Sequence, residues 1–118
     1  MQVVKSEHET GHVVDQISDG WTVVSGEPTM TTWFEYQSDD KSIVNGTWRA
    51  TPGVFHARSK YHEFVCMIDG EIVITAEGEE SVTVRAGDTF NIPAGFAGTW
   101  DIREPVLKRF LLCLSGLV

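Results

Sequence analysis

Two stretches decide the fold of this chain: GVFHARSKYHEFVCMIDG, residues 53–70, and GDTFNIPAGFAG, residues 87–98. Each contains a short run of β-branched and aromatic residues bounded by glycine turns, which is the pattern of a β-strand. The Asp69-Gly70 pair predicts a tight hairpin turn between residues 64–68 and 71–74, because such a pair suits the twist of two paired strands. Both stretches therefore predict antiparallel β-structure.

The same pattern continues outward through most of the chain. Short β-rich runs are expected at residues 21–25, 30–36, 47–51, 54–58, 61–68, 71–76, 81–85, 89–92, 99–103 and 106–114. Turns rich in glycine, proline, asparagine and aspartate separate them, and no helical periodicity is present. Many short strands spaced by turns predict an all-β sandwich or barrel, in which closure removes exposed edges. We expect one domain, residues 21–118, preceded by a polar N-terminal arm, residues 1–20, that is either loose or laid on a partner.

Composition excludes some classes of partner. The chain has 118 residues, and nine Lys and Arg against seventeen Asp and Glu give a net charge of −8. This charge repels polyanions, so we expect no nucleic-acid partner. No apolar run approaches the roughly 20 residues that cross a bilayer, and the first residues do not resemble a signal peptide. We therefore expect a cytoplasmic protein without a membrane partner, in which Cys66 and Cys113 are reduced and buried.

Strand alternation predicts a carboxylate inside the barrel. Tyr61, Glu63, Val65 and Met67 share one face of the strand at residues 61–68. If the apolar Val65 and Met67 line the interior, Glu63 points inward with them. The opposite face is also apolar after residue 63, so this strand is expected to be covered on both sides, by a second sheet or a second subunit.

Further polar groups are candidates for the same interior. Residues 54–58 alternate in the same way and put His56 and Arg58 on one face. If that face also looks inward, the two residues form with Tyr61 and Glu63 a titratable cluster on an apolar wall, the usual form of a small-ligand site. Trp100 follows Gly98 at strand spacing and shares its face, so it is a further candidate for the wall of this site. The alternative is an ion pair between Glu63 and Arg58 without any ligand. A β-bulge near residues 59–60 would change the facing of Arg58.

The number of available ligands decides the expectation for a metal ion. A mononuclear site uses three or four protein ligands, commonly imidazoles with a carboxylate. The candidate ligands here are His56 and Glu63, because Arg58 is permanently protonated and has no lone pair to give. We therefore expect no resident cofactor, and keep a divalent metal as the alternative.

The chain resembles the cupin superfamily, and more closely the small single-domain cupins (RmlC-like) grouped with the cupin domain of ureidoglycine aminohydrolase. The resemblance covers about residues 24–112. It is carried by Gly46-Thr47-Trp48, Thr51-Pro52-Gly53, Tyr61-His62-Glu63-Phe64, Ile68-Asp69-Gly70-Glu71, Ala86-Gly87-Asp88, Ile92-Pro93-Ala94-Gly95-Phe96, Gly98-Thr99-Trp100 and Val106-Leu107-Lys108.

This resemblance implies a double-stranded β-helix, the jelly-roll barrel of cupins, usually dimeric and with its pocket inside the barrel. In metal-dependent cupins the first motif supplies two histidines and a glutamate, and the second motif supplies another histidine. By resemblance, Glu63 matches the glutamate and His56 one histidine, whereas Arg58 and Gly98 stand in place of the other two.

Three functions follow as hypotheses. The first is a cupin that binds a small polar metabolite, in which Glu63 and Arg58 fix the ligand and His56, Tyr61 and Trp100 line the pocket. The second is a metal-dependent aminohydrolase-like enzyme acting on a ureido compound. The third is a non-catalytic assembly module, in which the apolar hairpin and the N-terminal arm form a homodimer or dock on another protein.

Overall fold

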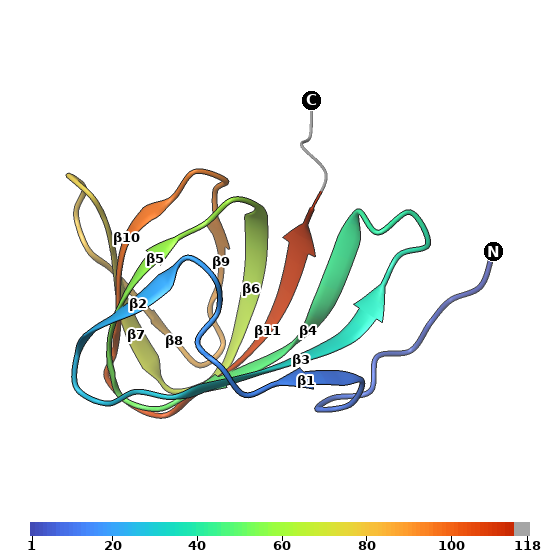
Figure 1. The fold of residues 1–118 in the computed structure, drawn as a ribbon, viewed down its shortest axis with the longest axis horizontal. Coiled ribbons are helices and arrows are strands. Elements are labelled where there is room, and N and C mark those ends of the chain that lie inside the picture. Colours follow the sequence, from blue (N-terminus) through green and yellow to red (C-terminus); the bar gives the residue numbers. More distant parts are fainter. Residues whose placement is uncertain (115–118) are drawn as a thin grey trace.

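Two antiparallel β-sheets face each other across a shared apolar core (Figure 1). The structure, a computed structural model, describes residues 1–114, which form eleven strands and no helix. One sheet has the strand order β1-β3-β4-β11-β6-β9 and the other has the order β2-β5-β10-β7-β8. The strands are β1 (His12–Val14), β2 (Trp21–Ser25), β3 (Met30–Gln37), β4 (Ile43–Ala50), β5 (Gly53–Arg58), β6 (His62–Asp69), β7 (Glu71–Ala76), β8 (Val82–Arg85), β9 (Thr89–Ile92), β10 (Ala97–Ile102) and β11 (Val106–Cys113).

The predicted all-β fold is thus confirmed for the described residues. The last positions of the predicted domain, residues 115–118, lie outside them. A helix long and apolar enough to cross a membrane is absent from residues 1–114. The alternation of side chains predicted from the sequence explains how these strands make a core, because each strand turns one face toward the opposite sheet.

The core forms where these inward faces meet. Phe55, Val65, Ile72 and Trp100 are all fully buried there. Glu63 lies on the same inward face of β6 as Val65, as predicted. The outward face of β6 is different, because Phe64 and Ile68 remain 39% and 45% exposed. No other part of residues 1–114 covers these two side chains, so a covering subunit stays a prediction.

The predicted hairpin at Asp69-Gly70 is wrong in its pairing. The turn is present, but β6 pairs with β11 and β9 in one sheet, and β7 pairs with β10 and β8 in the other. Gly70 has φ 92°, and a Cβ atom there would lie 2.4 Å from the carbonyl oxygen of Pro105. The chain therefore crosses from one sheet to the other at this point. The two sequence motifs lie side by side in both sheets, with β6 next to β9 in one and β5 next to β10 in the other.

An asparagine–glycine pair, typical of turns, lies inside a strand in this fold. Asn45-Gly46 reads as a turn in the sequence but lies inside β4, where Gly46 pairs with Phe34 of β3 and Phe110 of β11. A Cβ atom on Gly46 would come within 1.8 Å of the carbonyl oxygen of Trp33. Glycine is therefore required here by the close approach of two backbones beside a bulge in β3, and not by a turn.

The turn between β3 and β4 lies earlier, at residues 38–42, and is organised by Asp40. Its carboxylate accepts hydrogen bonds from the Ser42 hydroxyl at 2.7 Å, the Ser42 backbone N–H at 3.0 Å and the Ser38 hydroxyl at 2.8 Å. These bonds, with the Ser42 hydroxyl first, lower the pKa of Asp40 from 3.8 to about 2. Such a self-bonded aspartate is typical of a tight turn.

We therefore expect the Asp40 carboxyl group to titrate near pH 2. Because its pKa is lower in the folded chain, its contribution to stability is present above the unfolded value of 3.8 and is lost as the pH falls from there to about 2. A carboxyl carbon NMR titration measures this pKa directly, and the Asp40→Ala variant assigns the signal. A midpoint at the ordinary aspartate value would show that the three hydrogen bonds do not persist in solution.

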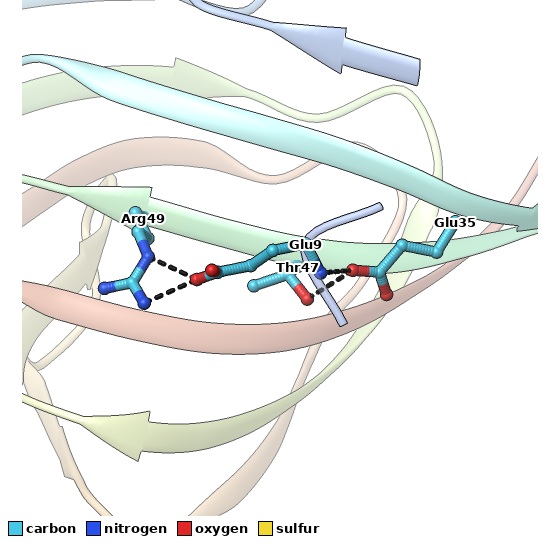
Figure 2. Close-up of polar contacts among 4 residues, drawn as sticks. All are labelled: Glu9, Glu35, Thr47 and Arg49. Atoms are coloured by element: carbon cyan, nitrogen blue, oxygen red, sulfur yellow. Dashed lines mark hydrogen bonds and ion pairs between the residues drawn. The ribbon is translucent and has the colours of Figure 1, made fainter. Parts of the chain in front are cut away.

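The N-terminal arm lies on the chain's own six-stranded sheet. Strand β1 pairs with β3, opposite residues 32–34. Before β1 in the chain, the Glu9 backbone N–H donates a hydrogen bond to the Glu35 carboxylate. This carboxylate also accepts a hydrogen bond from the Thr47 hydroxyl at 2.8 Å (Figure 2). The Glu9 carboxylate in turn bonds Arg49 at 2.5 Å. This part of the arm therefore covers the outer face of the sheet around Glu35, whose side chain is 1% exposed.

Candidate functional site

An open pocket of about 580 Å³ is lined by side chains from both sheets and by the end of the N-terminal arm. Its wall is aromatic, with Trp21, Phe34, Trp48 and Phe110 contributed by β2, β3, β4 and β11. Its volume lies in the range of roughly 300–1,000 Å³ that is usual for small-molecule sites. The size and the aromatic wall of this pocket make it a candidate ligand-binding site.

A buried ion pair stands on the inner side of this pocket. Lys108 Nζ donates to Glu63 Oε2 at 2.7 Å, and their side chains are only 3% and 11% exposed. Glu63 comes from β6 and Lys108 from the adjacent β11, where its Cα partner is Met67. Glu63 lies four residues before Met67 along β6, which is roughly 13 Å at the usual rise per residue. The long side chains of Glu63 and Lys108 reach toward each other over that distance.

Two indole rings complete the surroundings of the Lys108 ammonium group. Its Nζ lies 4.5 Å from the ring centroid of Trp48 and 4.5 Å from that of Trp100. Trp48 belongs to the six-stranded sheet and Trp100 to the five-stranded sheet, so the charge sits between the two layers. A buried ammonium is costly unless it is paired, and here a carboxylate and two aromatic faces replace its water. We call Glu63, Trp48, Trp100 and Lys108 the lysine cage.

Three of the predicted site residues lie at the pocket. Glu63 faces inward and lines it, as predicted. Arg58 and Tyr61 also line it, but both are exposed side chains next to the loop that joins β5 to β6. Glu63 pairs with Lys108 and not with Arg58, so the ion pair considered from the sequence has a different cationic partner.

The expectation that His56 faces the cavity is wrong. Its neighbours Phe55 and Ala57 are the fully buried residues of β5, so alternation turns His56 to the outside. There its Nε2 lies 3.0 Å from Glu77 Oε1. The bulk of Phe55 was the deciding signal, because a large apolar side chain competes for the interior more strongly than an imidazole. Trp100 faces inward but lies behind Lys108 and does not line the pocket.

Lys108 is the site residue that the sequence reasoning missed. A signal was available in β11, where Val106, Lys108 and Phe110 share one face and the two flanking residues are apolar. A lysine in the middle of an apolar face needs a buried partner, and Glu63 was the only inward carboxylate that had been predicted.

The residues present do not fit a metal centre of the kind that the cupin resemblance implies. Within residues 1–114 no three His, Cys, Asp or Glu side chains are grouped so that they could hold a metal ion. Glu63 already holds the Lys108 ammonium, whose charge repels a second cation. A Cβ atom on Gly98 would lie 2.2 Å from the carbonyl oxygen of Thr75, which leaves no room for a histidine there. His56 points away from the cavity.

Two polar atoms near the lysine cage have no hydrogen-bond partner among the described residues. They are Thr32 Oγ1 and Trp100 Nε1, both buried. Thr32 is 6% exposed and lines the pocket, so its hydroxyl lies in the wall that a ligand would contact. The Lys108 bond goes to Glu63 Oε2, so it leaves Oε1 of the same carboxylate able to accept from a ligand. Unpaired buried groups are costly, and a polar ligand would satisfy them.

A second cavity of about 630 Å³ lies between β7, β8 and β9. Its inner residues are apolar, among them Ile74, Val84 and Ile92, and its acidic residues Glu79 and Glu80 are exposed. It offers no buried polar group within the described part of the chain. The first pocket is therefore the better candidate.

Comparison with known proteins gives a consistent fold. The model of a family described as the EutQ-like cupin domain matches residues 37–110. No curated protein matches the chain.

Solved structures give the same result. A putative ethanolamine utilization protein Q from Salmonella typhimurium LT2 is 20% identical, with a TM-score of 0.66 over 75% of this chain and 72% of that one. The EutQ protein of Clostridium difficile is 17% identical, with a TM-score of 0.66 over 76% and 71% of the two chains. A cupin superfamily protein from Desulfitobacterium hafniense is 10% identical, with a TM-score of 0.57 over 95% and 84%. At these identities the likeness concerns the fold alone.

Proposed function

This chain belongs to the EutQ-like cupin domain family, and from that premise we propose that it binds a small polar metabolite inside its barrel without a metal ion. The observation that carries the proposal is the buried Glu63–Lys108 pair beside a pocket of metabolite size. A buried ion pair usually stabilises a fold no better than apolar residues of similar volume. Its place in an aromatic pocket supports a role in recognising a ligand.

The charges around the pocket indicate the class of ligand. Its lining contains three cationic side chains, Arg58, Lys60 and Lys108, against the two carboxylates of Asp19 and Glu63. This balance is positive although the whole chain carries −8. It favours a neutral or anionic ligand that has oxygen acceptors for the cationic side chains and a hydrogen-bond donor for Glu63, and whose apolar part rests against the indole and phenyl rings.

A thermal-shift screen of metabolites, followed by calorimetry on each hit, tests the proposal. We expect Glu63→Gln and Thr32→Val each to raise Kd by about tenfold or more, because a hydrogen bond to a charged group or to a buried hydroxyl is lost. His56→Ala is the matched control, since His56 lies outside the barrel, and its Kd should stay unchanged. Equal affinities in all variants would show that the ligand does not bind in this pocket.

Ethanolamine is one compound for this screen. The name of one structural neighbour refers to ethanolamine utilization, which is said of that protein and not of this chain. The cationic balance of the pocket works against an amine and favours its oxidised, uncharged or acidic derivatives. A hit among anions with no response to ethanolamine is therefore the expected pattern.

The metal-dependent aminohydrolase hypothesis finds no support in the donor set. Within residues 1–114, Glu63 is the one buried metal-binding side chain in the lining of this pocket, and Lys108 already neutralises it. Elemental analysis of protein purified without chelator tests it separately. Stoichiometric Mn, Fe or Zn bound through Glu63 would contradict a metal-free ligand site and support a metalloenzyme.

A homodimer is a second proposal, supported by the outer face of the six-stranded sheet. Phe64 and Ile68 are exposed there, and Leu111 of the neighbouring β11 is half-buried on the same face. Exposed apolar groups that adjoin one another are typical of subunit contacts. Sedimentation velocity at micromolar concentration should give the mass of a dimer, and Phe64→Glu should shift it to a monomer. A wild-type monomer would contradict this proposal.

A further inference from the structure

We propose that Lys108 is a nucleophile that captures a small aldehyde or ketone in the pocket as an imine. This inference rests on the proposed ligand pocket and names the class of compound that reacts there. Lys108 lines the pocket and is the one buried lysine of the four in the chain, since Lys5, Lys41 and Lys60 are all exposed. A lysine held in an apolar site is the usual residue for such chemistry.

The first requirement is a group that takes a proton from the ammonium. Glu63 Oε2 lies 2.7 Å from Lys108 Nζ, which is direct hydrogen-bond distance. Proton transfer along this bond gives the neutral amine and a carboxylic acid without separating charges, and the surrounding rings exclude much of the water. Glu63 therefore serves as the base in the first step and as the acid later.

The reaction then balances without any further reagent. The neutral amine attacks the carbonyl carbon, a C–N bond forms, and one proton moves from the attacking nitrogen to the carbonyl oxygen, which gives a neutral carbinolamine while Glu63 stays protonated. The C–O bond then breaks, the Glu63 carboxylic acid protonates the departing hydroxyl group, and water leaves. The product is a protonated imine, so one ammonium and one carbonyl compound give one iminium and one water, with no oxidant or reductant consumed.

The lysine cage suits the product as well as the free lysine. The iminium carries the same positive charge at the same nitrogen, so the Glu63 carboxylate and the faces of Trp48 and Trp100 stabilise it as they stabilise the ammonium. Thr32 offers its unpartnered hydroxyl in the same pocket and can bond the oxygen of the carbinolamine. A cage that served structure alone would need neither the open pocket nor this hydroxyl.

Trapping with cyanoborohydride tests the inference on the full chain. The protein is incubated with benzaldehyde, acetaldehyde or pyruvate and the reductant, and the modified lysines are identified by peptide mass mapping. With at least one probe, we expect Lys108 to be modified faster than Lys5, Lys41 and Lys60 by about tenfold, because its proton transfer is assisted. A structural lysine that is 3% exposed should be modified last of the four, and that order would overturn the inference.

Variants separate the roles of the two groups. Glu63→Gln should slow trapping at Lys108 by about a hundredfold, the usual effect of losing a positioned acid–base group. Lys108→Arg keeps the charge and should abolish the adduct, whereas Lys41→Arg is the matched control and should leave trapping at Lys108 unchanged. If Glu63→Gln proves unfolded by near-ultraviolet circular dichroism, the order of modification in the wild-type chain still decides.

The same experiment distinguishes this inference from the proposed function. A metabolite that binds with an affinity sensitive to Glu63, combined with no probe trapped at Lys108, would overturn imine formation and leave the binding pocket standing. Absence of both binding and trapping would contradict the two together.

Discussion

Lys108→Met is expected to lower the free energy of unfolding by about 3–5 kcal/mol, the usual cost of removing one partner of a buried ion pair. Methionine nearly matches the volume of the lysine stem, so little of this loss comes from a cavity. The loss comes from Glu63, whose carboxylate would remain in the interior without its ammonium partner at 2.7 Å. Urea denaturation followed by tryptophan fluorescence measures the change.

The double variant Glu63→Met with Lys108→Met separates a stranded charge from lost packing. It removes both charges, so we expect it to recover most of the stability that Lys108→Met loses. Arg85→Met is the exposed control, because Arg85 pairs with Glu71 at 2.7 Å but is 65% exposed in its side chain. It should cost at most about 1 kcal/mol. A Lys108→Met loss as small as that of the control would mean that water reaches Glu63.

Strand positions and side-chain facing depend on short-range sequence pattern, and these features could be predicted from the sequence. The strands β2, β7 and β9 have the predicted bounds, and Glu63 faces inward because Val65 and Met67 share its side of β6. The all-β class followed from the same alternation. The arm was harder, because its short strand β1 contributes three residues and is held by contacts with β3 and Glu35 that lie far away in the sequence.

The failures concern features that depend on long-range contacts. An Asp-Gly pair specifies a sharp turn, but whether the flanking strands pair or part depends on what lies beside them, and Pro105 occupies that place at Gly70. The partner of Glu63 was missed for the same reason, because Lys108 follows it by 45 positions and joins it through a four-residue offset between β6 and β11. Local alternation says which way a side chain points and says nothing about how far it reaches.

The side chains on the inner wall explain why membership of the cupin family does not by itself reveal the chemistry of this chain. A cupin barrel provides an inner wall, and its chemistry depends on the side chains placed there. In this chain Gly98 is held to glycine by the Thr75 carbonyl, Trp100 fills the space beyond it, and Lys108 brings a fixed cation to Glu63. Together these residues give an inner wall that holds a lysine beside Glu63.

Trp100→Ala is the second large effect that we expect, a loss of about 3–5 kcal/mol in the free energy of unfolding, as for other large-to-small changes in cores. Trp100 is fully buried, and its ring centroid lies 4.9 Å from that of Trp21 and 6.0 Å from that of Trp48. Its face also carries the Lys108 ammonium at 4.5 Å, so the variant weakens the lysine cage as well as the core. Urea denaturation, followed by far-ultraviolet circular dichroism, gives the value.

Trp100→Phe tells the packing role from the polar one. The phenyl ring keeps an aromatic face for Lys108 and also removes the indole N–H, which has no partner among residues 1–114. Because an unsatisfied buried donor costs about 1–3 kcal/mol, its removal should offset much of the lost ring area, and we expect a net change near 1 kcal/mol. Trp33→Ala, on the half-buried outer face of β3, is the control and should cost less than Trp100→Ala. If Trp100→Phe costs as much as Trp100→Ala, the indole N–H makes a hydrogen bond in solution that the phenyl ring cannot replace.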